Sequence, residues 1–142
     1  MRKGFSLLTA LIFLILIATI SALSISLSTQ SVKQTTDIYL KSQSELLVRS
    51  GVEYALLAIS GHNYASDGCL ESINMTYNNT HDINISIMYI GNGLTGANCV
   101  QLGTNIDTNE SNRTVIIDTW VRTQEGIVSE PIVMHRRSIQ KP

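Results

Sequence analysis

The side chains that most often carry chemistry are few and widely spaced in this chain. Its three histidines match no metal-ligand or catalytic-triad spacing; they are His62, His81 and His135. Its two cysteines, Cys69 and Cys99, have no histidine partner at zinc-finger spacing. We therefore predict that the protein is not an enzyme, binds no metal and needs no cofactor.

One oxygen-rich segment has the spacing of a calcium-binding loop. Asp107, Asn109 and Ser111 alternate along it, and Asp118 supplies a carboxylate at the twelfth position. However, Asn112 stands where such a loop needs a glycine for its turn, and Asp118 falls inside an expected strand. A polar surface loop is therefore favoured over a calcium site.

Asn-x-Ser/Thr patterns recur in this polar half of the chain. They start at Asn74, Asn78, Asn84, Asn109 and Asn112. The last three have an acidic residue two positions earlier, which resembles the extended acceptor pattern of bacterial N-glycosylation. Because asparagine, serine and threonine are abundant beyond residue 60, chance occurrence is favoured over glycan attachment.

A long apolar segment precedes all of these residues. No side chain from Phe5 to Val32 is charged, and residues 5–27 exceed the roughly 20 that a helix needs to cross a bilayer. Arg2 and Lys3 lie on its N-terminal side, which places the N-terminus in the cytoplasm by the positive-inside tendency. The chain after residue 30 is then expected outside the cytoplasm.

A location outside the cytoplasm favours a disulfide between the two cysteines. A disulfide between Cys69 and Cys99 would close a loop of about 30 residues and contribute about 3–4 kcal/mol. Free thiols and metal ligation are the alternatives, and the disulfide is favoured over both.

Helical periodicity continues beyond the apolar segment. Apolar positions recur at spacings near three, four and seven; they are Tyr39, Leu40, Leu46, Leu47, Ala55, Leu56 and Ile59. Gly61 is a plausible end of the helix. We therefore predict one helix from about 5 to 60, apolar all round at 5–30 and amphipathic at 31–60.

The predicted helix contains several small residues. Gly51 costs about 1 kcal/mol against alanine in mid-helix, so we expect another part of the protein to approach its backbone. Ala18, Ala22, Ser24 and Ser28 lie at i, i+4 spacings and would permit close contact with another helix.

The remainder, residues 61–142, has the pattern of a small antiparallel sheet. We predict strands at 83–90, 113–123 and 127–135, with a shorter one at 99–102 and a hairpin turn at 124–126. Ile83, Ile85, Ile87 and Tyr89 should share one face, and Pro131 suggests an edge strand. The expected fold class is α+β, a long helix packed on this sheet.

The opening residues resemble a known processing signal. The sequence MRKGFSLL resembles the short leader of type IV pilins and type II secretion pseudopilins. In that family a prepilin peptidase cuts after the glycine, and the new N-terminal phenylalanine is N-methylated. The resemblance, which covers residues 1–60, implies a leader at 1–4, cleavage between Gly4 and Phe5, and methylation of Phe5.

One position departs from the family pattern. Most pilins have a glutamate at the fifth mature position, where this chain has Thr9. A buried carboxylate is costly unless it is paired, and in the family it pairs with the N-terminus of a neighbouring subunit. Its loss is associated with minor subunits that start or cap a filament. The segment around Gly51 also resembles one found in some minor pilins.

The resemblance implies a location and partners. The chain would sit in the bacterial inner membrane with a cytoplasmic N-terminus and a periplasmic C-terminal part, until it enters a filament. Its partners would be prepilin peptidase, the inner-membrane assembly platform and other pilin or pseudopilin subunits.

Other interpretations stay open at this point. The apolar segment could be a secretory signal cut after Ala22-Leu23-Ser24, or a plain anchor. The exported part would then be a ligand-binding or adhesin domain without a filament role. DNA contact is less favoured than a solvated or subunit-facing surface, although the last hairpin is basic through Arg113, Arg122, Arg136, Arg137 and Lys141.

Overall fold

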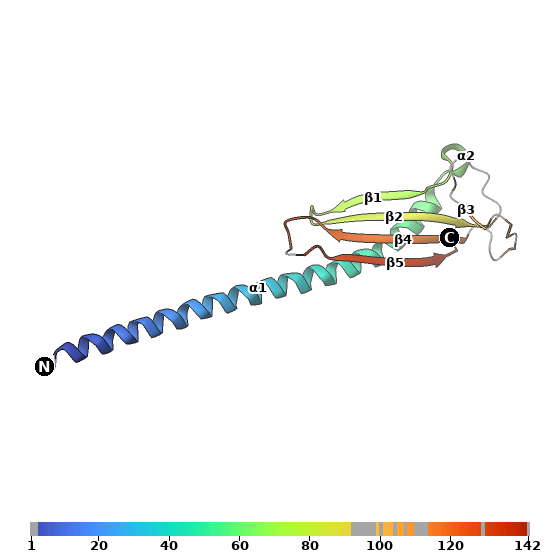
Figure 1. The fold of residues 1–142 in the computed structure, drawn as a ribbon. Coiled ribbons are helices and arrows are strands. Elements are labelled where there is room, and N and C mark those ends of the chain that lie inside the picture. The colour runs from blue at the N-terminus through green and yellow to red at the C-terminus, as the bar shows by residue number, and fades with distance from the viewer. Residues whose placement is uncertain are drawn as a thin grey trace. The chain divides into compact units, whose positions relative to one another are not determined.

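One long helix and a small sheet make up the fold (Figure 1). The computed structural model describes residues 3–91, 99, 101–103, 105–106, 108–109, 114–128 and 130–141. The helices are α1 (Lys3–Gly61) and α2 (Tyr64–Asp67). The strands are β1 (Ser72–Tyr77), β2 (His81–Ile90), β3 (Gln101–Leu102), β4 (Thr114–Thr123) and β5 (Val133–Gln140). The predicted α+β fold class is confirmed.

The helix α1 belongs to two compact units, which divide between Tyr39 and Leu40. The first unit contains the N-terminal half of α1. The second contains the C-terminal half together with α2 and all five strands. The predicted helix at 5–60 agrees with α1, which ends at Gly61.

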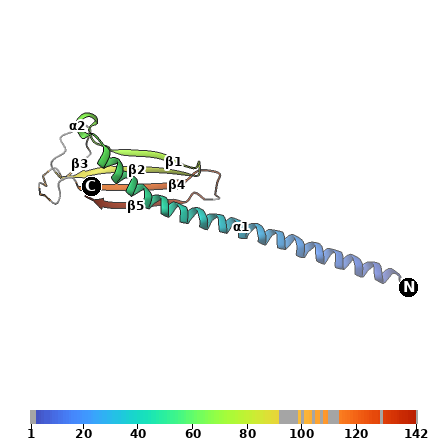
Figure 2. The same cartoon turned by 180° about the vertical axis from the view of Figure 1, so that it is seen from behind.

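The sheet has the order β1-β2-β4-β5, and all these neighbours are antiparallel. The short β3 pairs in parallel with the end of β2, through Tyr89 and Ile90. Seen from behind, the C-terminal half of α1 lies across one face of this sheet (Figure 2). We call this the inner face and the opposite one the outer face.

The core lies between the inner face and α1. Alternate residues of β2 are buried, including Ile83, Ile85, Ile87 and Tyr89, so the predicted shared face is confirmed. The inward apolar residues of β4 are Val115, Ile117 and Val121. The helix contributes Val48, Val52, Ala55 and Ile59. Such β-branched residues pack well on a pleated surface and stiffen it.

Gly51 faces the sheet where there is no room for a side chain. A Cβ built on Gly51 would lie 2.7 Å from Cγ2 of Thr119, in the middle of β4. Only a residue without a side chain fits there, which accounts for the glycine in mid-helix. The expected close approach is therefore present, and it is made by the chain's own sheet.

The buried face of α1 differs in part from the predicted one. Tyr39 and Leu46 were expected on it, but each is 63% exposed. The buried row includes Leu40 and Ser44, spaced four apart, and continues through the core residues already named. The polar Ser44 is accommodated because its hydroxyl donates to the carbonyl of Leu40, 2.8 Å away.

Strand β1 is absent from the sequence prediction. Its pattern alternates polar Ser72, Asn74 and Thr76 with apolar residues over only six positions. A tight turn joins it to β2: Asn78 and Asn79 have φ of 47° and 52°, and the Thr80 amide donates to the Tyr77 carbonyl at 2.9 Å. Two adjacent asparagines are typical of such a type I′ hairpin turn, so Asn78-Asn79 was the signal that could have located β1.

The predicted position of the last strand, 127–135, is wrong. Strand β5 is Val133–Gln140 and pairs with β4 up to Gln140 opposite Val115. The connection from Gln124 to Ile132 is longer than a tight turn, and Pro131 lies in it, ahead of the strand. Strand β5 lies at the edge of the sheet. Because it contains three consecutive polar residues, His135-Arg136-Arg137, it lacks the alternation of apolar and polar residues by which strands are predicted.

Candidate functional site

The N-terminal half of α1 exposes a continuous apolar surface. Its large apolar side chains between Leu7 and Leu27 are 49% to 70% exposed. Among the described residues, α1 is the one helix long and apolar enough to cross a membrane, with none of that apolar stretch buried within the chain. This is consistent with a single membrane span or with a signal sequence.

Several hydroxyl groups of this half donate hydrogen bonds within the helix itself. Thr19, Ser21, Ser24 and Thr29 each donate to a carbonyl three or four residues earlier, at 2.8–3.0 Å. Such bonds remove the cost of placing a hydroxyl in an apolar medium. Ser24 is one of the small residues expected at a helix contact, and its hydroxyl is engaged in this local bond.

The residues that resemble a processing site lie at the start of α1. Gly4 and Phe5 are in its first turns, and Thr9 is half-buried five positions along from Gly4. The chain is helical on both sides of the Gly4–Phe5 bond. Along the chain, Lys3 directly precedes this glycine, and the next charged residue is Lys33.

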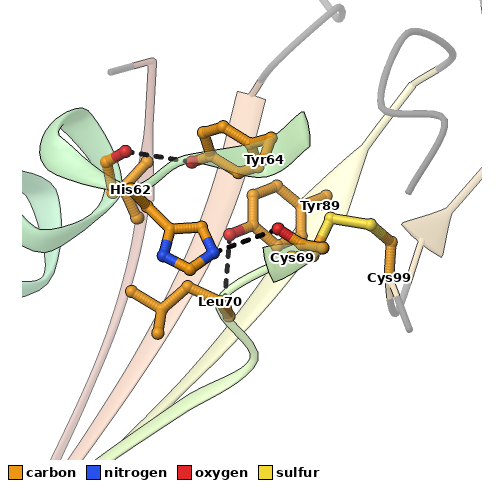
Figure 3. Close-up of a disulfide and its surroundings, with 8 residues drawn as sticks. His62, Tyr64, Cys69, Leu70, Tyr89 and Cys99 are labelled. Carbon is orange, nitrogen blue, oxygen red and sulfur yellow. Dashed lines mark hydrogen bonds between the residues drawn. A yellow bond between two sulfur atoms is a disulfide. The ribbon is translucent and has the colours of Figure 1, made fainter. Parts of the chain in front are cut away.

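Cys69 and Cys99 form a disulfide, with Cα atoms 5.0 Å apart (Figure 3). The bond links the segment after α2 to the segment before β3. His62, at the end of α1, contacts the Gly68 carbonyl through Nε2 at 3.0 Å. The Tyr64 hydroxyl donates to the Ile59 carbonyl at 3.1 Å. These contacts fix the loop between helix and sheet.

Tyr89 completes the same corner of the sheet. Its hydroxyl donates to the Leu70 carbonyl at 3.0 Å, and its ring meets the ring of Tyr64 edge to face (Figure 3). Burial, with a further contribution from Tyr64, raises the pKa of the Tyr89 phenol well above its usual range. Tyr89 therefore stays neutral and structural.

The outer face carries a cluster of four side chains that the sequence analysis did not bring together. We call Asp118, Trp120, His135 and Arg137 the outer-face cluster. Asp118 accepts two hydrogen bonds from Arg137, at 2.8 and 2.7 Å, and contacts Nε2 of His135 at 3.0 Å. The ring of His135 stacks on Trp120, with centroids 4.0 Å apart and planes 21° from parallel.

Strand pairing is what assembles this cluster. Asp118 is the register partner of Arg137, and Trp120 is the partner of His135, in neighbouring antiparallel strands. The Arg137 guanidinium holds the pKa of the Asp118 carboxyl below its usual range, and His135 adds to this against the opposing effect of burial. Asp118 thus remains an anion although its side chain is only 8% exposed.

Sequence patterns missed the cluster because β5 was placed too early. With β5 at 127–135, Arg137 fell outside the sheet. A spacing in the printed sequence could have indicated it. Asp118 and Trp120 lie two residues apart, as do His135 and Arg137, so each pair shares one face of its strand.

The other candidate ligand residues are not brought together. Of the calcium-loop pattern, Asp107 and Ser111 lie outside the described residues, and Asp118 is engaged by Arg137. No three His, Cys, Asp or Glu side chains in the described part of the chain could hold a metal ion. Of the Asn-x-Ser/Thr patterns, Asn112 lies outside the described residues, whereas Asn84 donates a hydrogen bond to Asn74.

The described features together decide the kind of architecture. A long N-terminal helix is apolar in its first half, its second half packs on an antiparallel sheet, and a disulfide follows the helix. The architecture is pilin-like. No protein-family model, curated protein or solved structure matches the chain. The pilin-like description therefore rests on these features of the molecule.

The two units differ in the surroundings of their apolar side chains. The second unit has an apolar core of its own, formed by the C-terminal half of α1 and the inner face of the sheet. The apolar half of α1 needs lipid or other helices around it. The outer face of the sheet is a second exposed surface.

Proposed function

We propose that the protein is a minor pilin or pseudopilin, a structural subunit that starts or caps a type IV pilus or a type II secretion pseudopilus. It enters the filament after prepilin peptidase cleaves between Gly4 and Phe5 and Phe5 is methylated. Until then it is held in the bacterial inner membrane by α1, with its second unit in the periplasm. Its role is assembly rather than catalysis.

The observation that carries this function is the helix α1. A cleaved signal sequence would end before the folded part, but α1 continues without interruption from the exposed apolar half into the core of the second unit. Cutting after Ser24 would leave Ile25 and Leu27, 69% and 59% exposed, as an apolar N-terminal extension. Removing only residues 1–4 keeps the whole apolar surface attached to the folded unit.

Thr9 supports a minor rather than a major subunit. The position that usually carries the glutamate holds a half-buried threonine here. A subunit with threonine has no carboxylate with which to pair a neighbour's N-terminus, and it avoids the cost of burying one. Such a subunit suits an end of the filament, where one of the two axial neighbours is missing.

Assembly can be tested in a bacterium that makes the filament, by measuring how much of the chain enters the sheared filament fraction. Gly4→Val should block cleavage and incorporation, because the peptidase acts next to a residue without a side chain. Gly61→Ala is the matched control, since a Cβ at Gly61 meets nothing within 4 Å. Equal incorporation of the Gly4→Val and Gly61→Ala variants would contradict the proposed processing.

The position in the filament has its own test. Thr9→Glu should raise the ratio of this chain to the major subunit, because the added carboxylate gives it the pairing of a shaft subunit. Thr9→Ser, which keeps the hydroxyl, should leave the ratio unchanged. An unchanged ratio for Thr9→Glu would rule against a role confined to the filament end.

A further inference from the structure

We propose that the outer face of the sheet binds an uncharged saccharide, with Trp120 as the surface on which a sugar ring stacks. This binding site goes beyond the assembly function proposed above and does not depend on it. Three properties of the outer face carry the inference: an exposed and oriented indole, neighbouring amide side chains, and a balance of charges.

The indole of Trp120 is exposed and yet held in one orientation. It is 46% exposed on the outer face, and the stacked ring of His135 covers one side of it. His135 is fixed in turn by Asp118, which Arg137 holds through two hydrogen bonds. A ligand therefore meets an aromatic surface that is already ordered, which lowers the entropic cost of binding.

The second side of the indole faces a row of amides. His135 lies on β5, so the uncovered side of Trp120 is directed toward β2, where its register partner is Asn84. Asn74 of β1 is the next residue across the sheet, and Asn84 donates a hydrogen bond to it. Both asparagines are exposed. A row of Asn74, Asn84 and Trp120 thus places donors and acceptors beside an apolar ring.

The two arginines described on this face, Arg122 and Arg137, have carboxylate partners. Arg137 is bound to Asp118, and Arg122 lies 3.9 Å from Glu125 and has Asp82 as its register partner on β2. Asp82 accepts hydrogen bonds from Thr76 and Gln124. Nucleic acid is bound mainly through cations that neutralise its phosphates. Arginines that already have carboxylate partners favour an uncharged ligand over such a polyanion.

A sugar ring matches this combination. One side of a pyranose is made of C–H groups, which pack on an aromatic face and are attracted by its negative electron cloud. Its hydroxyl groups exchange hydrogen bonds with amide side chains. One aromatic ring beside two exposed asparagines fits a terminal neutral hexose or N-acetylhexosamine of an oligosaccharide.

The fluorescence of Trp120 gives a direct test, because it is the single tryptophan of the chain. The full chain is held in a detergent without a sugar headgroup and titrated with lactose, maltotetraose and chitotetraose. We expect a saturable shift of the emission with at least one of them. We expect none with sialyllactose or with an oligothymidylate at physiological salt.

Variants assign the binding to this face, with calorimetry as the readout because one of them removes the fluorophore. Trp120→Ala should weaken the saccharide about tenfold, and Trp120→Phe less, since a smaller ring remains. Asn84→Ala, which leaves the indole in place, should also weaken it. The matched control is Tyr77→Ala, which removes an aromatic residue that is 40% exposed and lies on β1 outside the outer-face row.

Each variant is first shown to be folded by its thermal unfolding. The inference is overturned if none of the three neutral sugars shifts the emission, or if folded Trp120→Ala or Asn84→Ala binds as tightly as the Tyr77→Ala control. A shift with the oligothymidylate in place of the sugars would also overturn it and would assign the face to single-stranded nucleic acid.

Discussion

The two halves of α1 differ in what covers their apolar side chains. Leu14, in the first half, is 70% exposed, whereas Ile59, in the second, is 3% exposed. Both halves deal with hydroxyl groups in the same way, since exposed Ser21 and buried Ser44 each donate to the carbonyl four residues earlier. The backbone of the helix is thus common to both, and the difference lies in the surroundings.

The comparison teaches which pattern a helix can satisfy within its own chain. An apolar stripe, as in the second half, is covered by one face of a small sheet. Apolar residues on all sides, as in the first half, exceed what one sheet can cover and need lipid or neighbouring helices. The stability of the second unit should therefore be independent of the apolar side chains of the first.

Removing a core side chain should have the largest effect on stability, and it tests most strongly whether the two halves of α1 differ. Ile85→Ala removes three carbons from a fully buried position and should lower the free energy of unfolding by about 2–5 kcal/mol. Leu14→Ala, the matched control in the exposed half, should change it by less than about 0.5 kcal/mol. Guanidinium unfolding of the full chain in detergent, followed by Trp120 emission, measures both. Equal losses would mean that the halves are not independent.

The disulfide should contribute almost as much, and to the second unit alone. Replacing both Cys69 and Cys99 by serine opens a loop with a sequence separation of 30 and should cost about 3–4 kcal/mol. The helical content measured by circular dichroism below the unfolding transition should be unchanged. A loss of helix under these native conditions would show that the disulfide also supports α1.

Gly51 offers a smaller change at the contact between helix and sheet. Gly51→Ala should destabilise the second unit by about 1–3 kcal/mol. The new methyl group would lie only 2.7 Å from Cγ2 of Thr119, which is closer than two carbon atoms can pack. Adding Thr119→Ser, which removes that methyl group, should restore most of the loss in a double-mutant cycle. If Gly51→Ala stabilises the protein as helix propensity alone predicts, the close packing of α1 on β4 is contradicted.

The smallest effect is a pH dependence at the outer-face cluster. The pKa of Asp118 is lowered in the folded protein, so its contribution to stability is present above the unfolded pKa of about 3.9 and is lost as pH falls through the folded pKa. Arg137 is 61% exposed, and solvent screening keeps this contribution small. Denaturant midpoints of the wild type and Asp118→Asn should differ at pH 6, and the difference should shrink as the pH falls through the lowered pKa of Asp118. A difference that does not shrink on acidification would contradict the assignment.

The sequence was sufficient for the elements with strong periodicity. The helix α1 and the strands β2 and β4 were predictable because long apolar patterns at helical or alternating spacing leave few alternatives. The two cysteines allowed only one pairing within the chain. A mid-helix glycine implied a close neighbour, although the sequence could not tell that Thr119 would be that neighbour.

The outer-face cluster was beyond such reasoning. Its members lie on two strands, and they meet only in the register that pairs Asp118 with Arg137. The three consecutive residues His135-Arg136-Arg137 do not have the sequence pattern of a strand. The position of β5 follows instead from its pairing with β4. Register is a tertiary property, so local patterns do not determine which polar side chains touch.

The central claim is that the apolar half of α1 stays attached to the folded unit after residues 1–4 are removed. The mass of the mature protein, purified from a bacterium that has the peptidase, tests this most directly. We predict a chain that starts at Phe5 and carries one added methyl group. A chain that starts at Ile25 would instead show an ordinary secretory signal, and an intact Met1 would show a plain anchor; either result would contradict the account.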